Sequence, residues 1–183
     1  MTSRYTFYVF MLIALLTTSC RKRNEPAAPD ELSSGIAIYY SDYYKDKGVD
    51  AHVWEMEFDS GTVESTGNSY KGTGQILTFT DVFSPAPTSD AILHYGTYKL
   101  TDSHEEFTAI PGMEKDGYDL GAYLTIMIDG QVSGIEYFTA GSFDIQPAPD
   151  DSIDIHFDLQ RRSGTIYHNH FRAPLPLYTA VTE

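Results

Sequence analysis

Apolar and polar residues alternate along most of the chain, with the two-residue period of half-buried β-strands. From His52 to Phe58, every second residue is large and mostly apolar, while Glu55 and Glu57 lie between them. This alternation and similar apolar runs predict eight strands, at 36–40, 52–58, 75–81, 95–100, 122–128, 142–146, 153–160 and 165–171.

Turn signals separate these runs. Asp129-Gly130 lies between two apolar alternations and predicts a tight hairpin, and Arg162-Ser163-Gly164 predicts a three-residue loop with glycine in the left-handed conformation. Beyond the N-terminal apolar run, no segment keeps a helical repeat for more than two turns. The pattern therefore predicts an all-β domain, which we expect to be an antiparallel β-sandwich. A small closed β-barrel is the alternative, because the sequence does not show whether the first and last strands pair.

The alternation also predicts which side chains form the core. They share the apolar face of their strands, and they are Trp54, Met56, Phe58, Ile126, Ile153, Ile155, Phe157 and Leu159.

The N-terminal segment has the layout of a secretory signal peptide. Arg4 precedes an uncharged run from Tyr5 to Leu16, and small polar residues follow up to Cys20. The run is too short for a transmembrane helix, which needs about 20 apolar residues. Residues 15–20 resemble the lipobox of bacterial lipoproteins, with Thr17 in place of the usual leucine, so the resemblance implies lipidation of Cys20. An incidental cysteine in an ordinary signal peptide is the alternative.

Three segments follow from this reading: a signal peptide at 1–19, the lipidated cysteine with a flexible tether at 20–34, and a single all-β domain at 35–183. We therefore expect a lipoprotein anchored in a membrane of the cell envelope, at the periplasmic face or the cell surface. Cys20 is the only cysteine, which excludes a disulfide framework within the chain and a metal site built on thiolates.

The net charge of −14 narrows the classes of partner. All 26 acidic residues follow position 24, whereas four of the 12 basic residues precede it. A surface with this charge repels phosphate backbones, so we expect no nucleic-acid partner.

A family resemblance covers most of the chain after the signal peptide. It is carried by aromatic strand residues and glycine turns: Tyr39-Tyr40-Ser41-Asp42-Tyr43-Tyr44, Trp54-Glu55-Met56-Glu57-Phe58, Gly96-Thr97-Tyr98, Gly141-Ser142-Phe143 and Phe157-Asp158-Leu159. In these features the chain resembles small uncharacterised all-β lipoproteins of Bacteroidetes-type bacteria. The resemblance implies a fold and a compartment, and it carries no catalytic residue.

Two groups of residues are candidates for a binding site. Tyr39, Tyr40, Tyr43 and Tyr44 surround Asp42 at the end of a predicted strand, where aromatic faces and a carboxylate suit the C–H patches and hydroxyls of a glycan. The alternative is that tyrosine simply favours strands. In the same loop Asp42, Asp46 and Asp50 offer oxygen ligands to Ca²⁺, but their spacing matches no known calcium loop.

The second candidate group is on the C-terminal hairpin. A three-residue loop at 162–164 sets Asp158 opposite His168 and His156 opposite His170 on the polar face. Imidazole and carboxylate are ligands that zinc accepts, so these four residues form a zinc hypothesis. The alternative is a solvated polar strip, and the sequence indicates no other cofactor.

Together these features favour a non-enzymatic binding or interaction module of the cell envelope, for a glycan or an envelope protein. The alternative function is a small hydrolase or other envelope enzyme, for which the sequence identifies no catalytic residues.

Overall fold

The computed structural model describes residues 31–65, 69–87 and 93–180, which form β-strands and, within these ranges, one short 3-10 helix. The predicted all-β class is confirmed, and each of the eight predicted strands forms. The elements are β1 (Leu32–Tyr39), η1 (Lys45–Lys47), β2 (His52–Ser60), β3 (Glu64–Ser65), β4 (Tyr70–Lys71), β5 (Gly74–Ser84), β6 (Gly96–Leu100), β7 (Thr108–Ala109), β8 (Met113–Lys115), β9 (Tyr118–Leu120), β10 (Ala122–Ile128), β11 (Gln131–Pro147), β12 (Ile153–Arg161), β13 (Ile166–Ala173) and β14 (Leu177–Thr179).

The proposed signal peptide and Cys20 lie outside the described residues. Within the described ranges, no helix combines the length and the apolar character that crossing a membrane requires.

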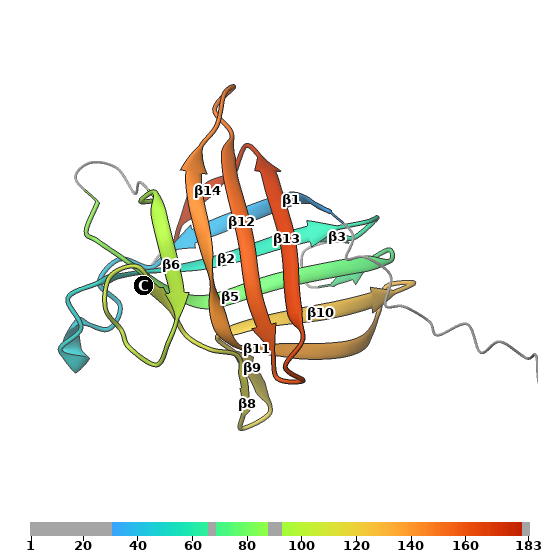
Figure 1. Ribbon diagram of the computed structural model, residues 1–183, viewed down its shortest axis with the longest axis horizontal. Coiled ribbons are helices and arrows are strands. Elements are labelled where there is room, and N and C mark those ends of the chain that lie inside the picture. The colour runs from blue at the N-terminus through green and yellow to red at the C-terminus, as the bar shows by residue number, and fades with distance from the viewer. Residues whose placement is uncertain (1–30, 66–68, 88–92, 181–183) are drawn as a thin grey trace, which may run out of the picture.

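The strands form two layers that cross each other. Figure 1 shows β1, β2, β5 and β10 running side by side, with β12 and β13 passing over them in a different direction. Two-layer packing is what the sandwich prediction describes. Most strand pairs are antiparallel, but β1 pairs in parallel with β13 and β14, and β6 with β7, so the main sheet is mixed.

The two layers are joined by hydrogen bonds at both edges. At one edge, β10 pairs with the first half of β11, and at the other edge β13 meets β1 at the Leu32–Phe171 pair. Within the first layer, β5 pairs with both β10 and β2. The path from β10 through β11, β12, β13, β1, β2 and β5 therefore returns to β10. The structure therefore has the two layers predicted for a sandwich. Its main sheet also closes on itself, as predicted for the alternative, a small closed barrel.

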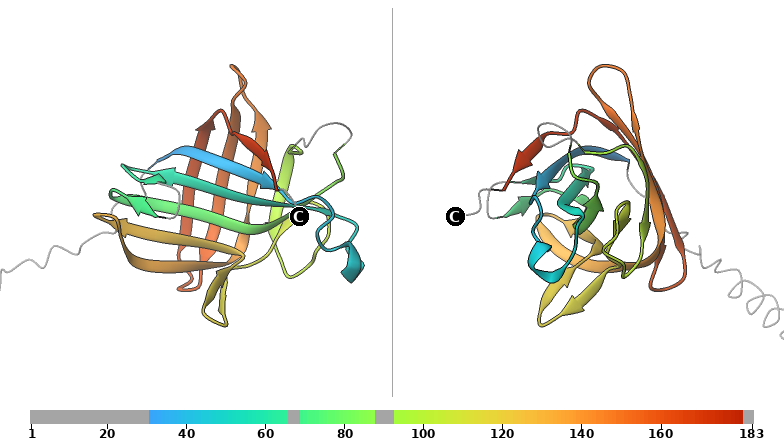
Figure 2. Two further views of the ribbon diagram at one scale, coloured as in Figure 1. Left: turned by 180° about the vertical axis from the view of Figure 1, so that it is seen from behind. Right: turned by 90° about the vertical axis from the view of Figure 1, so that its left-hand side faces the viewer.

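β11 makes one of these connections by bending from one layer into the other (Figure 2). Its first half pairs with β10, and its second half pairs with β12. The pairing with β12 shifts between Phe138 and Ala140, and Gly141 follows with φ +116°. A Cβ at this glycine would lie 2.2 Å from the carbonyl oxygen of Asp158, so only glycine fits at the bend.

Both predicted hairpins form. Asp129 and Gly130 have φ values of 51° and 75°, as a type I′ turn requires of its two central residues. In the second hairpin, the amide of Arg161 donates to the carbonyl of Thr165 at 2.8 Å, and Gly164 adopts φ 89°.

The core between the layers is aromatic. Phe157 packs against the rings of Phe58, Phe79 and Phe143, with centroid distances of 5.2, 5.9 and 5.9 Å. Of the predicted core residues, Trp54, Met56, Phe58, Ile155, Phe157 and Leu159 are buried.

Ile126 and Ile153 are only half-buried, contrary to the prediction. A register shift between Ile126 and Met127 buries Met127 in a smaller cluster with Val63 and Ile76. Ile153 is the first residue of β12 and packs at the margin of the main core.

The domain begins earlier than the predicted boundary. The sequence predicts a tether as far as Ser34, but β1 starts at Leu32, whose side chain is buried. Leu32 pairs with both Ser60 of β2 and Phe171 of β13, so it fills the place where the sheet closes. Residues 32–34, which the prediction assigned to the tether, therefore belong to the domain.

We expect that Phe157→Ala lowers the free energy of unfolding by about 3–5 kcal/mol, because it empties the space of a ring that is only 1% exposed. Urea denaturation measures this loss. Ile166→Ala in the same hairpin is the matched control, since Ile166 is 49% exposed, and its cost should be about 1 kcal/mol or less. Equal losses in the two variants would contradict the proposed core.

A second prediction concerns Glu57 on the outward side of β2. Its carboxylate accepts a hydrogen bond from the Tyr70 hydroxyl at 2.9 Å. Burial raises the pKa of Glu57 above its ordinary value of 4.5, and this outweighs the opposing effect of Tyr70. The folded state therefore retains this proton more readily than the unfolded state, and the contribution of Glu57 to stability falls as pH rises through 4.5 to the raised pKa.

Glu57→Gln keeps a hydrogen-bond acceptor for Tyr70 and removes the titration. We expect the stability of this variant relative to wild type to increase between pH 4 and pH 7, as measured by urea denaturation at both pH values. Glu114→Gln, at an exposed position on β8, is the control. A difference that does not change with pH would refute the prediction.

Candidate functional site

The β12–β13 hairpin positions the histidines in the register predicted from the sequence. His156 pairs with His170, and Asp158 pairs with His168. On β12, Ile155, Phe157 and Leu159 point into the core, so the residues between them point outward.

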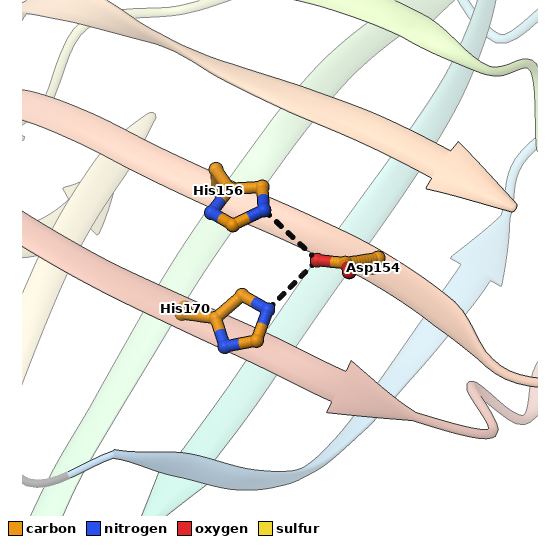
Figure 3. Close-up of side chains that lie close together, drawn as sticks. All are labelled: Asp154, His156 and His170. Atoms are coloured by element: carbon orange, nitrogen blue, oxygen red, sulfur yellow. Dashed lines mark hydrogen bonds and ion pairs between the residues drawn. The ribbon is translucent and has the colours of Figure 1, made fainter. Parts of the chain in front are cut away.

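Asp154, His156 and His170 converge on this outer face (Figure 3). The Nε2 atoms of His156 and His170 lie 3.1 and 2.7 Å from Oδ1 of Asp154. The two imidazoles stack with a centroid distance of 4.6 Å and an interplanar angle of 21°. Among the described residues, this is the one group of three possible metal ligands whose ligand atoms all lie within 4.8 Å of one another.

The structure divides the predicted zinc set of His156, His168, His170 and Asp158. Nδ1 of His168 lies 2.5 Å from Oδ1 of Asp158, so these two form a separate pair. Successive outward residues of a strand lie about 6.6–6.8 Å apart, which separates the two cross-strand pairs. Asp154 completes the group of three instead, and it lies on this face because it precedes His156 by two residues on β12.

Two charged residues border the cluster. Oε1 of Glu31 lies 4.0 Å from Nδ1 of His170, on the side of the ring away from Asp154. Arg172 is the cross-strand neighbour of Asp154. Asp154 is the most enclosed of the three cluster residues, and His156 is the most exposed, with 60% of its side chain accessible.

Most of the predicted glycan-binding residues are engaged in contacts within the domain. Tyr39 is buried against Trp54 and hydrogen-bonded to His52. The hydroxyl of Tyr40 donates to Glu55 at 2.9 Å, and that of Tyr44 donates to Asp81 at 2.7 Å.

These contacts shift the pKa values of the tyrosines. Burial, with the hydrogen bond to Glu55, raises the pKa of Tyr40 to about 12. Burial and the bond to Asp81 also raise the pKa of Tyr44. Both hydroxyls therefore remain protonated donors at physiological pH.

Tyr43 and Asp42 remain near the surface. The Tyr43 ring is 61% exposed and makes edge contacts with Tyr40 and Tyr44. Asp42 forms an ion pair with Lys45 at 2.9 Å, which lowers the pKa of Asp42. In the described part of the chain, Asp42, Asp46 and Asp50 do not form a three-ligand group, so the calcium hypothesis gains no support.

An open pocket of about 660 Å³ lies beside residues 40–44, the loop after β1 that we call the tyrosine loop. One wall is formed by residues 48–51, and the other by residues 104–107. The Tyr44 ring lies 5.9 Å from the ring of His104, so the tyrosine loop supports the second wall from behind.

This pocket was not predicted from the sequence. Asp50, Glu105, Glu106 and Phe107 are among its lining residues, and the ring of Phe107 also packs against Tyr98 with a centroid distance of 5.3 Å. No motif marks residues 104–107, and they meet residues 48–51 only because the strands that precede the two loops end at the same side of the domain.

Comparisons with known protein families, with curated proteins and with solved structures find no match to this chain. The candidate sites are therefore interpreted from their own geometry.

Proposed function

We propose that this protein is an exported, lipid-anchored binding module of the cell envelope that holds a glycan in the pocket between residues 48–51 and 104–107. The observation that carries the proposal is the pocket itself, whose walls combine carboxylates with an aromatic ring. Binding sites for small ligands have this form, with apolar surface and a few polar groups in fixed positions.

The first wall is held in place by local structure. η1 turns the chain after the tyrosines, and Gly48 ends it in the left-handed conformation with φ 78°. The amide of Gly48 donates to the carbonyl of Lys45 at 2.9 Å. A wall fixed in this way requires little ordering when a ligand binds.

The second wall is fixed by hydrogen bonds on both sides of Phe107. Its amide donates to Phe83 at 2.8 Å, and its carbonyl accepts from Lys99 at 3.0 Å. The hydroxyl of Thr108 donates to the carbonyl of Glu105 at 2.7 Å. These bonds hold Phe107 at φ 61°, a conformation that a non-glycine residue rarely adopts and that clusters at functional sites.

The chemistry of the walls favours a polyhydroxylated ligand. Asp50, Glu105 and Glu106 accept hydrogen bonds from hydroxyls, and the ring of Phe107 offers apolar contact to C–H groups. The exposed ring of Tyr43 contacts Tyr44, whose own ring lies 5.9 Å from that of His104 in the second wall. The same carboxylates repel phosphorylated ligands, in agreement with the net charge of −14.

The position of the pocket suits an anchored protein. In Figure 1, β1 points toward the end of the domain that carries η1, whereas the chain enters β1 at Leu32. A lipid anchor at Cys20 would hold the entry end toward the membrane and leave the pocket facing away. The 11 residues from Arg21 to Glu31 reach at most about 40 Å.

Glycan binding tests the proposed ligand class. We expect a glycan array to identify a neutral oligosaccharide whose affinity falls about tenfold or more in the double variant Asp50→Ala, Glu106→Ala, since two lost hydrogen bonds cost about 1 kcal/mol each. Tyr43→Ala should also weaken binding. Tyr118→Ala is the matched control, because Tyr118 is 71% exposed on the distant β9.

Two results would contradict this proposal: no bound glycan on the array, or equal losses in the pocket variants and in Tyr118→Ala. Release of cleaved products from a bound glycan would indicate the enzymatic alternative.

Membrane anchoring is tested separately. We expect the chain to fractionate with membranes and Cys20→Ala to release it into the soluble fraction, because the lipid attached to the cysteine is the proposed anchor. Immunoblotting of membrane and soluble fractions measures this. If Cys20→Ala remains with the membranes, the lipoprotein assignment is wrong, whatever the outcome of glycan binding.

A further inference from the structure

We propose that Asp154, His156 and His170 bind a divalent transition-metal ion on the outer face of β12 and β13. Each of these three side chains of suitable chemistry places one ligand atom within 4.8 Å of the other two, and both imidazole nitrogens face Asp154 (Figure 3). Two of them are on one strand and the third is directly opposite, so the backbone ladder fixes their spacing.

The two nitrogen–oxygen distances are close to those of a coordination sphere. Tetrahedral Zn²⁺ with bonds of about 2.0–2.2 Å keeps its ligand atoms about 3.3 Å apart. The Nε2 atoms of His156 and His170 lie 3.1 and 2.7 Å from Oδ1 of Asp154. Side-chain movements of about 0.6 Å or less therefore bring both nitrogen–oxygen distances to the tetrahedral value.

The donor set selects the class of ion. Two imidazole nitrogens and one carboxylate oxygen suit zinc and neighbouring first-row metals. Calcium and magnesium prefer sites built of oxygen ligands, so this set disfavours them. The exposure of His156 leaves room for water or another ligand at the fourth position.

Glu31 provides an outer contact for one ligand. Metal-binding histidines commonly donate their second ring N–H to a carboxylate, which orients the ring. Nδ1 of His170 faces Oε1 of Glu31 at 4.0 Å, while Nε2 faces Asp154. Glu31 comes to this position because Leu32 pairs with Phe171, the residue after His170.

The neighbouring pair Asp158–His168 provides an internal control. It has the same two residue types on the same face of the same two strands, with a contact of 2.5 Å, but it lacks a second histidine. Removing His168 therefore deletes an exposed imidazole from this face without changing the proposed site.

Calorimetry with ZnCl₂ tests the proposal on the full chain, purified without a polyhistidine tag and stripped of metal. We expect one Zn²⁺ per chain with a dissociation constant of about 1 μM or tighter and no heat from CaCl₂ under the same conditions. His156→Ala, His170→Ala and Asp154→Asn should each weaken binding about tenfold or more, whereas His168→Ala should bind as wild type does.

A thermal shift gives an independent readout. An ion that binds only the folded state stabilises it, so Zn²⁺ should raise the melting temperature of wild type and His168→Ala, and not that of His156→Ala. Circular dichroism without metal establishes that each variant is folded. Zn²⁺ binding weaker than micromolar, variants that bind like wild type, or an equal loss in His168→Ala would each overturn the assignment.

Discussion

The register of the β12–β13 hairpin determines both the core and the surface cluster of this domain. With Arg161 bonded to Thr165 across the turn, Phe157 points between the layers and His156 points outward to meet His170. A shift of one residue would exchange the two faces, placing histidines against Phe58 and Phe79 and exposing the apolar residues. The cost of burying imidazoles in an aromatic core therefore enforces the same register that assembles the cluster.

Closure of the sheet depends on the start of β1. Leu32 pairs with Phe171 on one side and Ser60 on the other, so a single buried leucine connects the two layers at this edge. The same contact brings Glu31 to the side of His170. The start of the described domain is thus also the border of the proposed metal site.

Periodicity predicted the strands well because most of them have one face in the core and one in solvent. It failed where that condition changes. After Ile126 a register shift turns the side chain of Met127 into the core in its place, and no alternation marks the bend of β11 at Gly141. The hairpin register followed from the turn, so the pairing of His156 with His170 could be predicted.

The membership of the cluster could not be predicted in the same way. The choice between Asp154 and Asp158 depends on which way the rings tilt along the strand, and a cross-strand pairing does not contain that information. The pocket was beyond prediction for a different reason. Its two walls are more than 50 residues apart in the chain, and neither carries a recognisable motif.

The two proposed sites are at opposite ends of β1. Glu31, at the border of the cluster, precedes the strand, and the tyrosine loop that supports the pocket follows it. A strand of eight residues spans about 26 Å. Screening at physiological ionic strength weakens charge interactions beyond about 8 Å, so a bound cation has little direct electrostatic effect on the pocket carboxylates. Coupling between the sites would require a change in the strands themselves, and the aromatic core packed against β1 and β2 opposes such a change. The geometry therefore favours two independent binding events on one domain.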